Sequence, residues 1–394
     1  MPHYETLSNR RTPRRIAVTL LATLILTACA SAATPTSVSP TAPTLALGTG
    51  VPNGMDALVA AAKAEGTLTT IALPHDWCNY GVVIDGFKAK YGLAVNELNP
   101  NASSGEKLEA IRANRDNNSP QSPDVIDMGF TFGPLAKDEG MLQPYKVATW
   151  DTIPADAKDA EGYWYGDYFG VLSFMVNTDV IKTTPQDWAD LLKPEYKSAI
   201  GLSGDPRLAH QAILSVLGAA LASGGSLDNA QAGLDFFANL NRSGNFVPLI
   251  ANNASVVDGK TPIRITWDYN ALYGRDLMAG NPPIEVVVPV TGRLASVYVQ
   301  AISKYAPHPN AAKLWMEYLY SDEGQLILLS PPGYCHPIRQ MDLERRGVLP
   351  TDLRAKLPGV EGAVFPSAAQ LTASNQFITQ NWDSVVGTVV QPAP

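Results

Sequence analysis

The stretch Tyr163–Asp179, YWYGDYFGVLSFMVNTD, decides the fold. Its middle, Phe169–Val176, is a nearly unbroken apolar run, which is typical of a strand buried on both faces. A cluster of aromatic residues with Asp167 precedes this run, and a helix signal follows it. We interpret the stretch as a crossing from one α/β lobe to a second, with its aromatic and acidic residues at the mouth of a cleft. The alternative is an ordinary core strand with a decorated edge.

Strand and helix patterns alternate on both sides of this crossing. Thr67–Leu73, Leu93–Leu98 and Pro123–Gly129 have the pattern of short strands, and a helical pattern follows each of them. Ser103 and Glu106 are spaced as a capping box, which predicts the start of one of these helices. Repeated strand–helix units of this length predict a mainly parallel sheet with helices on both faces.

A second long apolar strand, Leu294–Ser303, is predicted to return the chain to the first lobe, and Pro309–Ser330 is predicted as one helix. A folded part of about 340 residues exceeds the size at which a single core usually keeps growing, so two lobes are expected. The fold class is therefore α/β, with two lobes, hinge strands and a ligand cleft between the lobes. The predicted divisions are a leader (1–28), a tether (29–51), lobe 1 (52–168), lobe 2 (169–293), a return to lobe 1 (294–331) and a C-terminal segment across the hinge and lobe 2 (332–394).

The first 28 residues have the pattern of an export signal. Four arginines between positions 10 and 15 form a basic start, and Ile16–Leu26 is an apolar core too short to span a bilayer permanently. The run Leu26–Cys29 resembles the lipobox of bacterial lipoproteins, in which lipid chains on Cys29 would hold the protein at a membrane surface. A simple secretory signal with a chance cysteine is the alternative. Residues 30–50 carry no charge and are rich in Ser, Thr, Pro and Ala, which favours an unfolded tether.

Charge excludes some classes of partner. Removing residues 1–28 takes four Arg and one Glu from the 29 basic and 37 acidic residues, which leaves a net charge of −11. An acidic chain without a basic stripe is a poor binder of nucleic acid and has a mild preference for cationic small molecules.

Two cysteines, Cys78 and Cys335, remain beyond Cys29. In an exported protein they are candidates for a disulfide, although the sequence alone does not show that they meet. The alternative is that Cys78 is a free nucleophile, with His75 and Asp76 nearby in the sequence.

Polar and aromatic residues follow the ends of the predicted strands, where open α/β sheets bind their ligands. The candidate ligand-binding residues in these loops are Asp76, Trp77, Tyr80, Ser103, Ser104, Phe130, Thr131, Asp205, Arg207, Trp267, Asp268 and Tyr269. Carboxylates beside aromatic faces suit an ammonium group. Arg207, in the first turn of a helix, suits a carboxylate or phosphonate. For any single residue, a surface turn or a satisfied core polar group is the alternative.

Metal and enzymatic sites have weaker support. Ferric iron prefers several anionic oxygens, and the chain has no adjacent tyrosine pair in a loop of lobe 2 and no ligand spacing among its five His. Nucleophile-elbow, phosphate-loop and dinucleotide fingerprints are absent from the sequence. We expect no metal, no cofactor and no enzymatic activity.

The crossing stretch, together with Thr184–Lys197 (TPQDWADLLKPEYK) and Ala306–Gln325 (APHPNAAKLWMEYLYSDEGQ), resembles the solute-binding lipoproteins of ABC importers. The similarity extends from about Asn53 to the C-terminus and is to the branch with polyamine, ferric-iron, phosphonate and γ-aminobutyrate binders. It implies a type II periplasmic-binding-protein fold whose lobes close on a ligand and present it to a permease. It also implies that the loops at 74–80, 103–106, 204–207 and 267–269 line the cleft. The paired tyrosines of the iron binders are missing here, whereas thiaminases share the fold and use a catalytic cysteine.

We therefore expect a monomeric, membrane-tethered importer subunit outside the cytoplasmic membrane that captures a polyamine or an amino-acid-like zwitterion. Three aspartates, Asp76, Asp268 and Asp205, would bind the ammonium group. Trp77, Trp267 and Tyr269 would stack on the ligand, and Arg207 would bind any carboxylate. Closure would bend the chain at residues 168–171 and 294–298. A ferric-iron binder and a thiaminase-like enzyme that uses Cys78 are the alternatives.

Overall fold

The computed structural model describes residues 54–115, 117 and 119–392. The predicted leader, the lipid site at Cys29 and the tether lie outside the described residues. Within the described part, no helix is both long enough and apolar enough to pass through a bilayer.

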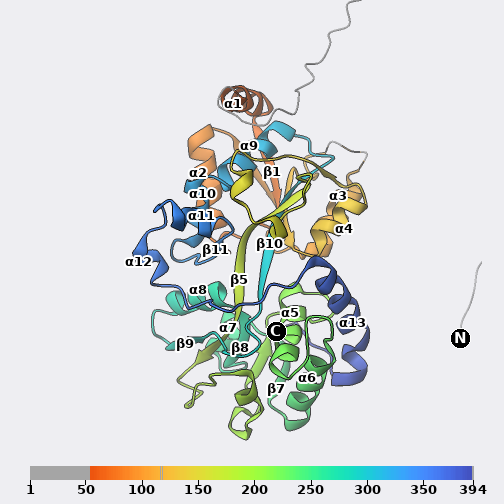
Figure 1. The fold of residues 1–394 in the computed structure, drawn as a ribbon, viewed down its shortest axis with the longest axis vertical. Helices are drawn as coiled ribbons and strands as arrows, with labels where there is room; N and C mark the ends of the chain where they lie inside the picture. Colours follow the sequence, from red (N-terminus) through yellow and green to blue (C-terminus); the bar gives the residue numbers. More distant parts are fainter. Residues whose placement is uncertain (1–53, 116, 118, 393–394) are drawn as a thin grey trace, which may run out of the picture. The chain divides into compact units, whose positions relative to one another are not determined.

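Two strands cross between two groups of strands, β5 (Trp164–Asn177) and β10 (Ala295–Ser303). Both are almost completely buried, as their apolar sequences predict. They pair antiparallel, and their register shifts between Tyr298 and Val299, where the ladder passes from one group to the other. Figure 1 shows the two strands running side by side between the groups. The predicted crossing and its return strand are therefore confirmed.

One half of the folded part, called the first half below, has a sheet in the order β2-β1-β3-β10-β5, in which β1, β2 and β3 are parallel. Its other strands are β1 (Thr67–Ile71), β2 (Ala94–Leu98), β3 (Val125–Gly129) and the short β4 (Leu142–Gln143). Its helices are α1 (Gly54–Glu65), α2 (Tyr80–Tyr91), α3 (Ser104–Ala113), α4 (Phe132–Asp138), α9 (Pro309–Leu319) and α10 (Asp322–Leu329). The capping box predicted for Ser103 and Glu106 opens α3.

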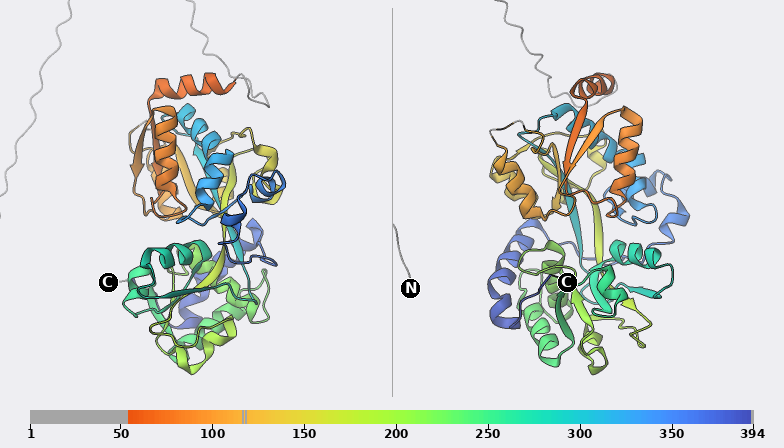
Figure 2. Two further views of the ribbon diagram at one scale, coloured as in Figure 1. Left: turned by 90° about the vertical axis from the view of Figure 1, so that its left-hand side faces the viewer. Right: turned by 180° about the vertical axis from the view of Figure 1, so that it is seen from behind.

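The second half continues from β5 in the order β5-β8-β6-β7, with β9 also paired to β5. Its strands are β6 (Ile200–Leu202), β7 (Phe246–Ile250), β8 (Ile263–Trp267) and β9 (Ile284–Val287). Its helices are α5 (His210–Ala222), α6 (Gln231–Ser243), α7 (Asn253–Val257) and α8 (Asp268–Met278). Figure 2 shows the two halves at opposite ends of the crossing strands. The predicted α/β fold with two lobes is confirmed.

The predicted single helix at 309–330 was wrong. The chain forms α9 and α10 instead, because Ser321 accepts a hydrogen bond from the backbone N–H of Gly324 and starts a new helix.

The C-terminal segment contacts both halves. The short strand β11 (His336–Pro337) pairs with β5 at Tyr168 and Phe169, where β5 passes between the halves. The helices α11 (Gln340–Arg345) and α12 (Thr351–Arg354) follow it. Helix α13 (Ala368–Val386) packs on the second half, where the ring of Trp382 lies 5.6 Å from that of Phe237.

Candidate functional site

A cavity of about 450 Å³ lies between the two halves. The first half contributes loops that follow β1 and β2, and the second half contributes the loop after β7, a side chain of β8 and the first turns of α8. The lining residues are Pro74, Asp76, Trp77, Asn101, Asn252, Asn253, Ala254, Arg264, Asn270 and Tyr273. These loops converge because the strands that carry them end at the edges of the two sheets that face each other.

Arg264 gives the second wall of the cavity a positive charge. Its Nε donates to Ser203 Oγ at 2.8 Å, and its Nη1 donates to Asn253 Oδ1 at 2.9 Å. Among the described residues, no carboxylate forms an ion pair with it. Burial lowers the pKa of Arg264 to about 10, so the guanidinium still carries its charge at neutral pH. Arg264 is half-buried, and a partly desolvated charge without a counter-ion favours a ligand that supplies one.

Amide donors lie beside this guanidinium. Asn270 lines the cavity, and its buried Nδ2 has no partner among the described residues. The side-chain oxygen of Asn252 caps α7, where it accepts a hydrogen bond from Ser255 N at 2.8 Å. The free amide donor and the guanidinium together form a wall suited to anionic oxygens.

The opposite wall is acidic and aromatic. Asp76 is exposed on the cavity, and it forms no ion pair with another described residue. Burial and the carboxylate of Asp76 together raise the pKa of Tyr273 on α8, so the charge of Asp76 acts on the second half. Trp77 beside it is fixed by its indole N–H, which donates to Tyr168 Oη at 2.6 Å. The ring of Trp77 packs edge-on against Tyr269, with centroids 5.4 Å apart.

Tyr80 does not reach the cavity. Its hydroxyl lies between Asp127 and Asp167, at 2.7 and 2.6 Å, inside the first half. Burial and the neighbouring charge of Asp127 hold the pKa of Asp167 well above its usual range, whereas Lys107 lies 3.7 Å from Asp127. This network therefore stabilises the interior behind Trp77 rather than contacting a ligand.

Four other predicted residues of the first half lie outside the cavity lining. Ser103 caps α3, and Ser104 Oγ accepts from Gly129 N at 3.1 Å. Phe130 packs edge-on against Trp164, and the buried Thr131 Oγ1 has no partner among the described residues. These contacts organise the edge of the first sheet.

The predicted charged residues of the second half pair with other residues of the protein. Arg207 binds Asp205 at 2.6 Å and Asp383 of α13 at 3.2 Å, so its charge is compensated within the protein. Asp268 is fully buried: it accepts from Val171 N at 3.0 Å and lies 2.8 Å from His336 Nε2. None of Asp205, Arg207 and Asp268 is among the residues that line the cavity.

Trp267 and Tyr269 also differ from their predicted role. Both rings are buried and pack between the cavity and the crossing strands. Trp267 Nε1 donates to Tyr298 Oη at 3.4 Å, and the hydroxyl of Tyr269 has no partner among the described residues. Tyr269 packs against Trp77, and neither Tyr269 nor Trp267 is among the residues that line the cavity.

The cavity-lining residues that the sequence analysis did not name are Asn101, Asn252, Asn253, Ala254, Arg264, Asn270 and Tyr273. The one available signal was Arg264, a charged residue within the otherwise apolar strand Ile263–Trp267. Charged residues in buried strands are rare unless they are paired or functional.

Cys78 and Cys335 are joined by a disulfide, so the predicted pairing is present in the structure. In this state the sulfur of Cys78 is not a thiolate, and covalent chemistry would need it. The described residues also hold no group of three or more His, Cys, Asp and Glu placed to bind a metal ion.

Comparison with known proteins identifies relatives over most of the chain. A family described as bacterial extracellular solute-binding protein matches residues 121–334. An uncharacterized protein of Haemophilus influenzae is 30% identical over 255 residues, which cover 61% of this chain and 68% of that protein. A Salmonella typhimurium protein named "Putative 2-aminoethylphosphonate-binding periplasmic protein" is 27% identical over 341 residues, 82% of this chain and 89% of that protein.

Solved structures show the same fold. The periplasmic binding protein AfuA from Actinobacillus pleuropneumoniae, solved with fructose-6-phosphate bound, has a TM-score of 0.64 and 20% identity. The match covers 82% of this chain and 98% of AfuA. The two halves and their crossing strands are therefore those of a type II periplasmic binding protein.

Proposed function

Because the chain belongs to the family of bacterial extracellular solute-binding proteins, we propose that its cavity binds a small solute that carries both an amine and an anionic phosphonate or carboxylate group. Proteins of this kind serve ABC importers by delivering a solute to a membrane permease. The proposed solute class selects the zwitterion from the two classes that the sequence left open, a polyamine and an amino-acid-like zwitterion.

The observation that carries this proposal is the half-buried Arg264, which lines the cavity and has no carboxylate partner among the described residues. A polyamine would place further positive charge beside it, which is unfavourable in a partly desolvated cavity. An anionic group would instead complete its hydrogen bonds, as a bidentate partner.

The amine would bind to the first wall. Asp76 supplies a carboxylate, and the adjacent face of Trp77 adds cation–π attraction of about 0.5–2 kcal/mol. The name of the Salmonella relative agrees with this combination of groups, although that relative shares only 27% of its aligned residues.

The remaining features of the proposal come from the sequence. We propose that the mature chain is a monomer anchored by lipid on Cys29 to the outer face of the cytoplasmic membrane. We also propose that it is not an enzyme, which agrees with the bonded state of Cys78. Ferric-iron binding is the alternative.

Isothermal titration calorimetry with five probes tests the solute class: 2-aminoethylphosphonate, β-alanine, ethylphosphonate, putrescine and ferric citrate. We expect the two zwitterions to bind more tightly than ethylphosphonate, which lacks the amine, and putrescine not to bind measurably. Binding of putrescine or ferric citrate in preference to the zwitterions would refute the proposed class.

A further inference from the structure

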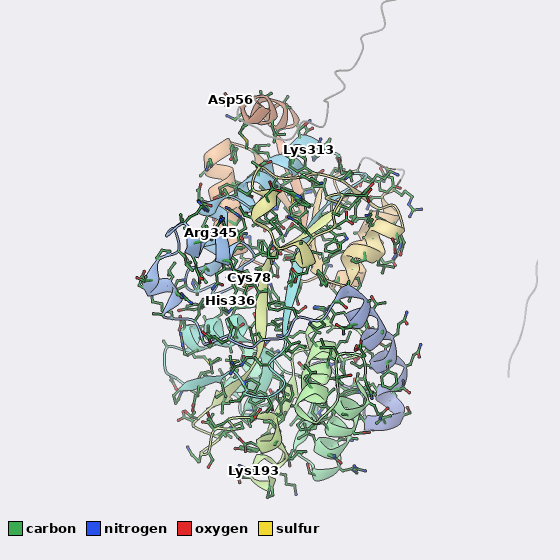
Figure 3. All side chains as sticks on the ribbon, in the orientation of Figure 1. Asp56, Cys78, Lys193, Lys313, His336 and Arg345 are labelled. Atoms are coloured by element: carbon green, nitrogen blue, oxygen red, sulfur yellow. A yellow bond between two sulfur atoms is a disulfide. The ribbon has the colours of Figure 1, made fainter. Side chains whose placement is uncertain are left out.

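Three consecutive residues of the C-terminal segment connect both walls of the cavity from behind. The hydroxyl of Tyr334 donates to the carboxylate of Asp276 on α8, Cys335 forms the disulfide with Cys78, and His336 Nε2 lies 2.8 Å from Asp268 Oδ2. In Figure 3, Cys78 and His336 are labelled beside the crossing strand β5. We call residues 334–336 the strap.

The strap is held firmly to the first half. Besides the disulfide, Asn79 Nδ2 donates to the carbonyl oxygens of Ile327 at 2.8 Å and Ser330 at 2.6 Å, just before the strap. Gly333 comes so close to this amide that a Cβ on it would lie 2.6 Å from Asn79 Nδ2. Since Cys78 follows Asp76 and Trp77 directly, the strap moves with the acidic wall of the cavity.

The strap contacts the second half at both ends of α8: His336 lies against Asp268 at its start, and Tyr334 binds Asp276 near its end. Arg275 donates to Asp276 Oδ1 through Nε at 2.9 Å and Nη2 at 2.8 Å, which leaves Oδ2 for the hydroxyl of Tyr334. The guanidinium of Arg275 also lies 5.9 Å from the centroid of the Tyr334 ring. Burial and the hydrogen bond to Asp276 raise the pKa of Tyr334 to about 12, so the hydroxyl remains a donor at neutral pH.

The backbone of Tyr334 has a φ of 56°, a left-handed conformation that is unfavourable for a residue with a bulky side chain. Its ring is nevertheless buried against the second half. Strain of this kind persists only where surrounding contacts over-determine it, and here those contacts come from both halves.

We propose that Tyr334 is a positioning residue for solute binding, which latches α8 to the strap and so favours the arrangement in which the two walls face each other. Tyr334 and Asp276 do not line the cavity, but α8 also carries Asn270 and Tyr273, which do. The inference rests on the proposed solute-binding role and adds a determinant of affinity that the solute does not touch.

The latch acts through the population of the closed arrangement. When the binding-competent state is only partly populated, apparent affinity falls in proportion to that fraction. Loss of one hydrogen bond to a charged group therefore predicts a decrease in affinity of about 3- to 10-fold.

The test compares Tyr334→Phe and Asp276→Asn with Tyr145→Phe, measured on the full chain. Tyr145 is a matched control, because its hydroxyl donates to Glu317 at 2.7 Å but both residues belong to the first half. Calorimetry with 2-aminoethylphosphonate gives the affinity, thermal unfolding gives the stability, and small-angle scattering without solute gives the separation of the halves.

We expect Tyr334→Phe and Asp276→Asn to weaken binding by about 3- to 10-fold and to increase the radius of gyration without solute. Tyr145→Phe should lower the melting temperature and leave affinity and scattering unchanged. The latch is refuted if scattering is unchanged in both latch variants, or if all three variants lose affinity in proportion to stability. If 2-aminoethylphosphonate and β-alanine do not bind the unmodified chain, the proposed solute class fails, and the scattering result alone decides the latch.

Discussion

Asp76 and Asp268 each follow a strand, and both suit an ammonium group by residue type, but the fold uses them differently. Asp268 is fully buried, and its carboxylate accepts hydrogen bonds from the backbone N–H groups of Val171 and Tyr269 and contacts His336 Nε2. Asp76 faces the cavity without an ion-pair partner among the described residues. A carboxylate at the end of a strand is therefore available to a ligand only when the protein has not already satisfied it.

Two arginines of the second half, Arg207 and Arg264, differ in the same way. Arg207 is compensated by Asp205 and Asp383, whereas Arg264 has only neutral partners, Ser203 and Asn253. The charge of Arg207 is thus balanced by carboxylates of the protein, whereas the charge of Arg264 on the cavity wall is available to a solute.

The largest expected effect is on stability, in the region behind the cavity. Asp268→Ala leaves His336 and the N–H groups of Val171 and Tyr269 without their acceptor, which predicts a loss of about 3–5 kcal/mol in the free energy of unfolding. Urea denaturation measures it. Asp76→Ala is the control and should change stability by less than about 0.5 kcal/mol. Equal losses in the two variants would remove the distinction between the regions.

A second, smaller effect on stability should depend on pH. His210 is buried against Ser296 and the ring of Tyr298, and burial lowers its pKa to about 4. In the unfolded chain this histidine binds a proton near pH 6.5. The free energy that neutral His210 contributes to stability is therefore complete above pH 6.5 and is lost as the pH falls towards 4. The loss is about 3 kcal/mol.

Urea denaturation between pH 7.5 and 4.5 checks this window. His210→Gln should flatten the slope that His210 contributes. An unchanged profile in His210→Gln would show that other groups cause the acid destabilisation.

The fold was predictable because its signals are local. The apolar runs of β5 and β10 and the capping box at Ser103 are contained in short stretches of sequence. The break between α9 and α10 was missed because a single capping serine outweighed a continuous helical pattern.

The site was only partly predictable because it depends on pairings between distant residues. Asp383, which pairs with Arg207, lies 176 residues from it in the sequence. His336, which contacts Asp268, lies 68 residues from it. Propensity and spacing contain no information on such contacts. Asp76 and Trp77 line the cavity as expected, whereas Arg264 became a candidate only when the structure showed that it lines the cavity and has neutral partners.

On the cavity side, the largest expected effect is on affinity. Arg264→Gln removes the positive charge but keeps a hydrogen-bonding group, and we expect affinity for 2-aminoethylphosphonate to fall at least about 50-fold. Calorimetry measures it. Arg207→Gln serves as the matched control and should lower stability while changing affinity less than about threefold. If Arg207→Gln lowered affinity more than Arg264→Gln did, the anionic group would bind at the loop after β6 instead.

The smallest expected effect separates the two ends of the solute. Asp76→Asn keeps the size of the side chain and removes its charge, so affinity for 2-aminoethylphosphonate should fall about 10-fold, since one exposed charge-assisted contact is lost. Affinity for ethylphosphonate, which has no amine, should be unchanged or slightly higher. The control Asp85→Asn alters a carboxylate that is 72% exposed and lies outside the cavity lining, and it should affect neither probe. If Asp76→Asn weakened both probes equally, Asp76 would act by orienting the wall. If it weakened neither, the amine would bind elsewhere, and the acidic wall would have no role in recognition.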